Sequence, residues 1–210
     1  MEFITDPTEI ENKSFEMISE LLGDRQFEPQ NLSIIKRVIH TTADFDYADN
    51  LVFTKDAAAI AKDALKNGAR IVTDTQMSRS GINKSAAAKL GCDILCFIDS
   101  PEVAEIAKAK GSTRARAAVD RAVETLEKPI IFAVGNAPTA LIRLYEHIKD
   151  NAYKPDLIIA VPVGFVNVVE SKELILGLDI PSITARGRKG GSNVAAAICN
   201  ALMYEITTRE

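Results

Sequence analysis

Short apolar runs alternate along the chain with longer segments that are rich in alanine. Five of these runs are expected to form strands, because each holds several consecutive apolar residues between turn-forming residues. They cover residues 69–74, 93–98, 129–135, 156–162 and 180–185. Runs that are apolar throughout, without alternation, are typical of strands that are buried on both faces of a parallel sheet.

The segments between these runs are expected to form helices. Several carry a capping residue or proline at their start and a glycine after their end, as at Ser100, Pro101 and Gly111. The expected helices cover residues 55–67, 83–90, 100–110, 113–127, 138–149, 171–176 and 192–207. Strands and helices that alternate through short loops predict right-handed crossovers and an α/β fold, a three-layer sandwich with a mainly parallel sheet.

The first forty residues follow a different pattern. Apolar positions at helical spacing predict a helix over residues 7–22 that packs on the main body, and a second helix or extended segment over 31–39 leads to His40. No internal repeat or Pro/Ser-rich linker interrupts the sequence. Residues 1–210 are therefore expected to form a single domain with an N-terminal helical extension.

Composition narrows the classes of function. Hydrophobic residues make up 47% of the chain and charged residues 26%, which is ordinary for a globular protein and excludes an extended disordered chain. The net charge is −4 and no long segment concentrates Lys and Arg, so we expect no nucleic-acid partner. No apolar run approaches the roughly 20 residues that span a bilayer, so we expect no membrane segment.

The cysteines and the N-terminus favour a cytoplasmic protein. Cys92, Cys96 and Cys199 are odd in number and are expected to be reduced thiols. The chain has only two histidines, and neither neighbours a cysteine pair, so we expect no metal site. The first residues lack the basic start and apolar run of a signal peptide.

Polar, glycine-containing loops follow four of the expected strands, at residues 74–81, 135–139, 162–167 and 185–193. Ligands of open parallel sheets bind outside the carboxyl ends of the strands, so we expect the site among these loops. Loop 185–193 combines glycines with three cations at the start of a helix. On chemistry alone it is either a clamp for a carboxylate or phosphate or a flexible, solvated loop.

Three further basic or titratable features need an interpretation. Arg114 and Arg116 form either surface ion pairs or a loop that grips an anion. His147 lies among charged residues of an amphipathic helix, so we expect it to be exposed to solvent and not catalytic. His40 has the residue type that suits proton transfer near neutral pH, but the residues alone favour a buried, structural histidine.

Six segments, in this order, resemble the precorrin-8X methylmutase family over nearly the whole chain. They cover residues 10–15, 37–45, 74–82, 135–141, 162–166 and 185–192. The resemblance implies a Rossmann-like α/β sandwich, a homodimer with sites near the subunit interface, and a corrinoid substrate. Enzymes of this family move a methyl group from C-11 to C-12 of (cobalt-)precorrin-8, an isomerisation in cobalamin biosynthesis.

The resemblance also implies roles for individual residues. His40 corresponds to the proton donor and acceptor, Ser14 to a substrate-binding serine, and Arg114 or Arg116 to a substrate-binding arginine. Other residues of the same segments are expected to bind the substrate: Thr41, Arg79, Asn136, Arg186, Lys189, Gly190 and Ser192. Methyl migration needs protonation of the conjugated ring and no redox group, so we expect no cofactor.

Two other functions stay open as alternatives. A non-catalytic corrinoid carrier would bind the tetrapyrrole without converting it. A phosphate-binding α/β enzyme would use loop 186–193 for a phosphorylated ligand and would have no affinity for corrinoids. The residues do not indicate whether the substrate contains cobalt.

Overall fold

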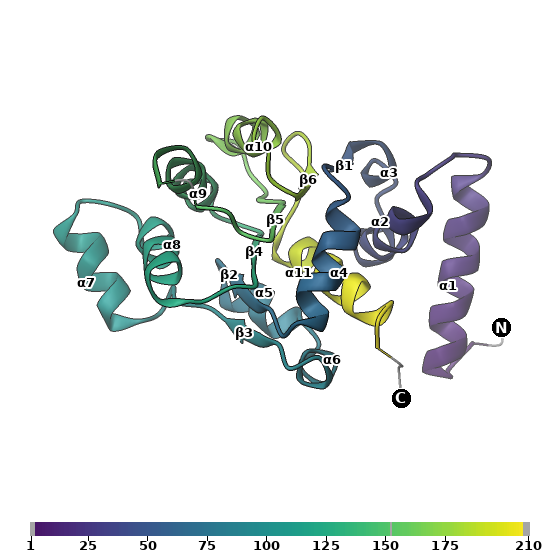
Figure 1. Ribbon diagram of the computed structural model, residues 1–210. Helices are drawn as coiled ribbons and strands as arrows, with labels where there is room; N and C mark the ends of the chain where they lie inside the picture. Colours follow the sequence, from purple (N-terminus) through teal and green to yellow (C-terminus); the bar gives the residue numbers. More distant parts are fainter. Residues whose placement is uncertain (1–2, 152, 208–210) are drawn as a thin grey trace.

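A six-stranded sheet forms the centre of the structure, a computed structural model that describes residues 3–151 and 153–207 (Figure 1). The strand order is β1-β6-β5-β4-β2-β3. The strands are β1 (Leu51–Phe53), β2 (Arg70–Thr73), β3 (Asp93–Leu95), β4 (Ile130–Val134), β5 (Leu157–Ala160) and β6 (Ser182–Ala185). Strands β2 to β6 pair in parallel, and β1 pairs antiparallel with β6 at one edge.

The sheet is covered on both faces, which explains its apolar strands. Every residue of β4 and of β5 is buried. Successive side chains of β4 enter different clusters of buried residues: Ile131 and Ala133 join one, Phe132 and Val134 the other. This alternation is that of a pleated strand between two cores. Burial of each large aliphatic or aromatic side chain stabilises the fold by about 1.5–3 kcal/mol.

The helices form the two outer layers. Helices that pack on the face of Ile131 are α2 (Pro29–Thr42), α4 (Ala57–Lys66), α5 (Gln76–Gly81), α6 (Lys84–Lys89) and α11 (Ser192–Tyr204). Helices that pack on the face of Phe132 are α8 (Arg114–Thr125), α9 (Pro138–Asn151) and α10 (Val168–Leu176). Helix α7 (Pro101–Ala109) packs on α8, and the short α3 (Tyr47–Asn50) precedes β1. The predicted three-layer α/β sandwich is confirmed.

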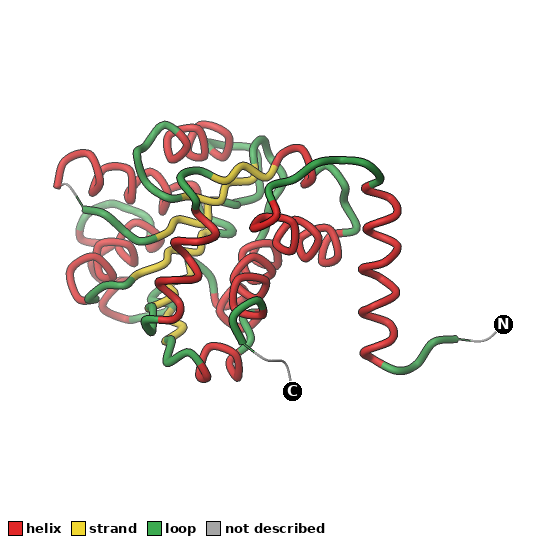
Figure 2. Tube along the Cα trace, turned by 45° about the vertical axis from the view of Figure 1, so that its right-hand side comes forward, coloured by secondary structure: helices red, strands yellow, loops and turns green. Residues whose placement is uncertain are grey.

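The N-terminal helical extension is also confirmed. Helix α1 (Pro7–Leu22) buries Ile18 and Leu22 and packs on α2, which in turn packs on α11. Figures 1 and 2 show α1 at one side of the molecule, clear of the sheet. Helix α2 continues to Thr42, so His40 lies on its last turn.

Helix α11 is apolar on almost every side because it lies between the sheet and α2. Nine of its residues are buried, from Val194 to Met203. It has only 13 residues. No helix in the part of the chain that the structure describes has the length and apolar character needed to cross a membrane.

Among the described residues the structure adds three short elements to those that the pattern predicts, the four-residue helix α3 and two others. Helix α5 occupies residues expected to form a loop; Thr75 caps it by accepting a hydrogen bond from the Ser78 amide. Strand β1 has three residues and lies at the sheet edge. Neither segment is long enough to show a helical or alternating period. The strand expected over 93–98 ends at Leu95.

Candidate active site

The strand order reverses between β2 and β4, at the carboxyl edge of the sheet. Strand β3 pairs with β2 on one side, and β4, β5 and β6 follow in turn on the other. Such a switch point is where open α/β sheets bind ligands. Asp74 lies there, directly after β2, and its carboxylate accepts hydrogen bonds from the amides of Gly135, Asn136 and Ala137 at 2.9, 2.8 and 2.6 Å.

Burial dominates the environment of this carboxylate. Only 7% of Asp74 is exposed, and burial raises the pKa of the carboxyl group, whereas the three amide hydrogen bonds act to lower it. The amides need an acceptor because the turn before α9 has no other partner for them. Asp74 therefore fixes the loop after β4 to the loop after β2.

The loop after β6 packs directly against these two loops. The hydroxyl groups of Thr75 and Ser192 lie 2.8 Å apart and share a hydrogen bond. A Cβ at Gly135 would lie 2.8 Å from the carbonyl oxygen of Gly191, and a Cβ at Gly190 would overlap the carbonyl oxygen of Val161. Both positions require glycine for this close approach. Loops from four strands thus meet at one edge.

A buried lysine supports loop 186–191 from beneath. Lys172 of α10 is fully buried, and its Nζ donates hydrogen bonds to the carbonyl oxygens of Gly187 and Lys189, both at 2.8 Å. Burial lowers the pKa of Lys172 to about 8. The loop that the sequence singles out for its surface cations is thus anchored by a cation inside the protein.

Lys189 connects this loop to the end of α2. Its Nζ lies 2.6 Å from carboxylate oxygens of both Asp44 and Asp46. These contacts raise the pKa of Lys189 and lower that of Asp44. The Arg186 amide also donates to the carbonyl of Asn50 at 2.8 Å. The charge of Lys189 is therefore largely compensated by the protein.

His40 is exposed on the last turn of α2, a few residues before Asp44. Its ring stacks on Phe15 of α1, with centroids 5.1 Å apart and planes inclined by 22°. The favoured interpretation from the residues alone, a buried structural histidine, is wrong. Thr41 is exposed beside it, and Ser14 precedes Phe15 on α1, where its hydroxyl donates to the Ile10 carbonyl.

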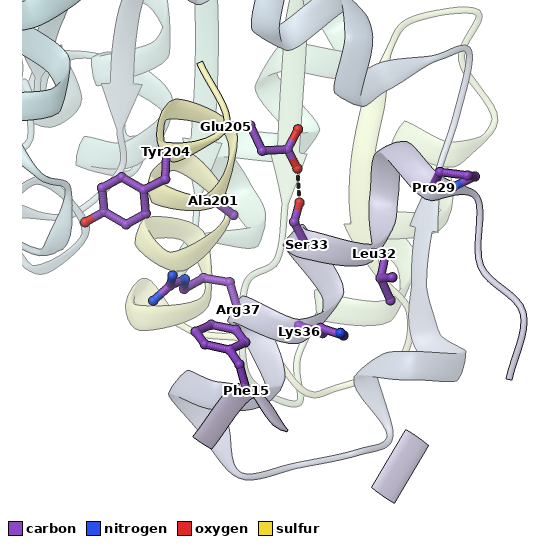
Figure 3. A pocket seen from close by; sticks show the side chains of 9 residues that line it. All are labelled: Phe15, Pro29, Leu32, Ser33, Lys36, Arg37, Ala201, Tyr204 and Glu205. Atoms are coloured by element: carbon purple, nitrogen blue, oxygen red, sulfur yellow. Dashed lines mark hydrogen bonds between the residues drawn. The ribbon is translucent and has the colours of Figure 1, made fainter. Parts of the chain in front are cut away.

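Arg37 also contacts the Phe15 ring. Its guanidinium lies 4.6 Å from the centroid of the Phe15 ring and 5.3 Å from that of Tyr204, and it forms a 2.6 Å ion pair with Glu11. Figure 3 shows the side chains of Phe15, Arg37 and Tyr204 in one row between α1, α2 and the end of α11. The Phe15 ring is thereby fixed under His40.

A pocket of about 430 Å³ lies beside this row (Figure 3). Its lining comes from α1, α2 and the end of α11 and the residues flanking them: Phe15, Pro29, Leu32, Ser33, Lys36, Arg37, Ala201, Tyr204 and Glu205. Phe15 both lines the pocket and stacks on His40, so the pocket and the imidazole share this ring, although His40 itself is not part of the lining.

The structure distinguishes the two candidate arginines of α8. Arg116 is half-buried and forms two hydrogen bonds to the carboxylate of Glu146, at 3.0 and 2.7 Å. Arg114 is exposed at the first position of the helix and forms no ion pair with any described residue. A hydrogen bond of 3.0 Å between Thr113 and Thr139 joins this helix start to the start of α9. Arg114 is thus the arginine that is available to a ligand.

The remaining predicted residues lie along the same edge. Arg79 is exposed on α5, and its Nε donates to the Ile94 carbonyl at 3.1 Å. Arg186 is exposed, and its Nε lies 3.4 Å from a carboxylate oxygen of Glu173. Asn136 is exposed beside Asp74, so its side chain is open to solvent.

The predicted residues therefore fall into two groups. One group lies on α1 and on the last turn of α2: Ser14, His40 and Thr41. The ion pair between Lys189 and Asp44 joins the end of α2 to the loops. A second group follows the sheet edge: Arg79, Asn136, Arg186, Gly190 and Ser192. Arg114 lies at the same edge but on the layer opposite α2.

The expectation that His147 is exposed is wrong. His147 is 7% exposed, and its Nε2 lies 2.7 Å from Asp120 of α8, which also accepts a hydrogen bond from Arg143. Burial alone would raise the pKa of Asp120, but Arg143 and His147 lower it overall. The partner of His147 is 27 residues away in the sequence, on another helix, so the local pattern does not reveal it.

Sequence reasoning assigned no role to three residues that shape the site: Asp74, Phe15 and Lys172. Lys172 had a detectable pattern, because it is spaced from Val168 and Ile175 as residues on one helix face, and all three are buried. Asp74 and Phe15 fall inside the segments that carry the family resemblance, but their contacts arise only from the fold.

Comparisons with known proteins agree on one family. A family model described as precorrin-8X methylmutase matches residues 9–205. The cobalt-precorrin-8 methylmutase of Salmonella typhimurium is 47% identical over 98% of this chain and 99% of its own, and that of Priestia megaterium is 43% identical over 93% and 87%. A crystal structure of the precorrin-8X methylmutase from Thermus thermophilus superposes with a TM-score of 0.87 at 38% identity, covering 93% and 94% of the two chains.

The buried lysine predicts a pH dependence of stability. Lys172 has an ordinary pKa of 10.5 in the unfolded chain and about 8 in the folded protein, so the folded state loses its proton first. Stability rises with pH where the unfolded state binds more protons. Relative to Lys172→Met, the free energy of unfolding of the wild type should therefore rise between about pH 8 and about pH 10.5, by at most about 3 kcal/mol. Urea unfolding of both proteins at several pH values measures this; parallel curves would contradict the assignment.

Proposed function

The chain belongs to the precorrin-8X methylmutase family, and we propose that His40 supplies the proton for its reaction and that its substrate is the cobalt-containing form, cobalt-precorrin-8. The protein is an isomerase of cobalamin biosynthesis. Support for the cobalt form comes from two relatives that are 47% and 43% identical to this chain. Both are named cobalt-precorrin-8 methylmutase.

The reaction is an intramolecular transfer. The bond from the methyl group to C-11 breaks while the bond to C-12 forms, so no group leaves the ring. Protonation of the conjugated ring system makes this shift favourable, and the same proton must be returned because the product is an isomer of the substrate. One residue that both donates and accepts a proton is sufficient.

The position of His40 carries this proposal. Its imidazole is exposed to a ligand, whereas the only other histidine, His147, is buried against Asp120. The stacked ring of Phe15 restricts the orientation of the imidazole, and Arg37 restricts Phe15. A fixed proton donor needs no reorganisation when the ring arrives.

The carboxyl edge of the sheet supplies groups that suit the rim of the macrocycle, which bears acetate and propionate side chains. Arg114 and Arg79 have exposed guanidinium groups, and Ser192 begins α11, where free amides favour an anion. Thr41 follows His40 on α2, and Ser14 precedes Phe15, the residue on which His40 stacks. We assign these residues to substrate binding and residues 1–210 to one functional unit.

We also propose that the protein is a homodimer. Ile10, Met17 and Leu21 lie on one stripe of α1 and are 44%, 51% and 67% exposed. Helix α1 packs on the body through α2 and lies at the side of the molecule (Figure 2), and the three residues of the stripe are exposed. Exposed apolar stripes of this kind mark interaction surfaces, and a second copy of α1 would cover it.

A cytoplasmic location is the last part of the proposal. All three cysteines are free thiols, and Cys92 and Cys199 are buried. Burial raises the pKa of the Cys199 thiol to about 12, so this thiol is unreactive. Unpaired thiols of this kind fit a reducing compartment.

The purified protein should convert cobalt-precorrin-8 to a product with the absorption spectrum of cobalt-cobyrinate. We expect a higher kcat/KM with cobalt-precorrin-8 than with metal-free precorrin-8X, measured by visible absorbance under the same conditions. A protein that binds the tetrapyrrole without changing its spectrum would be a carrier. One that binds inorganic phosphate but no corrinoid would be a phosphate enzyme, and either result overturns the methylmutase assignment.

His40→Asn should lower kcat by about 10²–10⁴ and preserve corrinoid binding, because general acid–base assistance is lost while the rim contacts stay. The matched control is the second histidine. His147→Asn weakens the buried contact with Asp120 and should lower stability by about 1–3 kcal/mol without affecting kcat. Circular dichroism, thermal unfolding and the absorbance assay compare the two variants. Wild-type turnover by His40→Asn would exclude this residue from proton transfer.

Charge on the α1 stripe should separate the proposed dimer. The wild type should have about twice the 22.8 kDa mass of one chain in light scattering, and the double variant with Met17→Asp and Leu21→Asp should have the mass of one chain. Asn12→Asp, on the same helix but outside the stripe, should remain dimeric. A wild type with the mass of a single chain at micromolar concentration would disprove the dimer.

A further inference from the structure

Lys172 is the fully buried cation of α10, and the proposed proton transfer gives it no role. Lysine is almost never fully buried unless it is paired with a carboxylate. Among the described residues Lys172 has no such partner, and its hydrogen bonds go to two neutral carbonyl groups. Burial of a lone charge is unfavourable for folding. A methionine would fill the same space without this cost, which points to a function for the charge.

The two carbonyl groups determine where the amides of the same peptide units point. The units that join Gly187 to Arg188 and Lys189 to Gly190 are both trans. In a trans unit the carbonyl and the following N–H point in opposite directions. Since both carbonyls point at Lys172, the amides of Arg188 and Gly190 point away from it.

These two amides have no acceptor within the described part of the protein. The neighbouring Gly191 amide donates to the Val161 carbonyl at 2.8 Å, and the Arg188 carbonyl accepts from the Gly164 amide at 3.2 Å, so the backbone of the loop is held at both places. No such bond exists for the amides of Arg188 and Gly190 among these residues. The loop is therefore fixed, with two donors left for a ligand.

We propose that Lys172 is a positioning residue that holds loop 186–191 so that the amides of Arg188 and Gly190 face outward and can each donate to a carboxylate of the tetrapyrrole rim. Each of these amides can donate one hydrogen bond to an anion, and a charged acceptor strengthens that bond. The side chain of Arg188 is exposed beside them, whereas that of Lys189 is compensated by Asp44 and Asp46. This inference rests on the proposed function for the identity of the ligand.

Lys172→Met removes the positive charge and both hydrogen bonds to the loop. The methionine side chain is also unbranched, but it is apolar. The expected result is a rise of at least about tenfold in KM and in the dissociation constant of the corrinoid product, with little change in kcat, because proton transfer from His40 is untouched. Ile175→Ala is the control: Ile175 is buried on the same helix in the apolar cluster with Phe132, and its side chain has no hydrogen-bond donor, so its loss should lower stability and leave KM unchanged.

Hydrogen exchange without substrate tests the loop independently of the reaction. The amides of Gly164 and Gly191 are bonded through the loop, so both should exchange faster in Lys172→Met than in the wild type or in Ile175→Ala. If Lys172→Met does not fold, Lys172→Gln, which keeps an uncharged NH2 donor group on a shorter side chain, should show smaller changes in the same directions.

The two measurements separate the possible failures. Unchanged exchange would overturn the positioning role of Lys172. Faster exchange with unchanged product affinity would make Lys172 a purely structural residue and would overturn the carboxylate site. A wild type that neither binds nor converts corrinoids would refute the proposed function, whereas the exchange result would still decide whether Lys172 holds the loop.

Discussion

The buried carboxylate of Asp74 determines the geometry of the candidate site. It lies where the strand order reverses, and it accepts three amide hydrogen bonds from the turn between β4 and α9. Without an acceptor there, the buried amide of Gly135 would be unpaired, which costs more than an ordinary hydrogen bond contributes. The Thr75 hydroxyl shares a hydrogen bond with that of Ser192, and Gly135 packs closely against Gly191. The loop after β6 is thereby held against the loops after β2 and β4. The loops of the candidate site are therefore positioned by the Asp74 carboxylate, by one pair of hydroxyl groups and by close backbone packing.

Most cations of the site have a structural partner. Lys189 joins loop 186–191 to Asp44 and Asp46, and Arg116 joins α8 to Glu146. These pairs place elements from distant parts of the chain and contribute little attraction for an external anion. The groups that remain for a ligand are a few guanidinium groups, among them that of Arg114, and backbone amides. A local count of Lys and Arg thus overstates the charge that a substrate meets.

The sequence revealed the parts of the fold that depend on local pattern. Strands β4 and β5 were predicted because burial on both faces makes every residue apolar. Strand β1 was missed because three residues at an edge show no period. His147 was placed on the surface because its partner Asp120 is on another helix, and the choice between Arg114 and Arg116 needed the position of Glu146. Contacts between elements, which pattern does not encode, decide these cases.

The two parts of the site differ in how firmly they are held. The loops at the sheet edge are anchored by Asp74 and Lys172, two groups inside the protein. His40 lies on α2 and is oriented by Phe15 of α1, a helix at the side of the molecule (Figure 1). In the proposed function, the rigid edge orients a large ring through its carboxylates, and His40 as proton donor needs only to reach one ring position. The placement of His40 depends on the packing of α1 against α2. The proposed dimer, which would cover the apolar stripe of α1, would therefore also influence the orientation of His40.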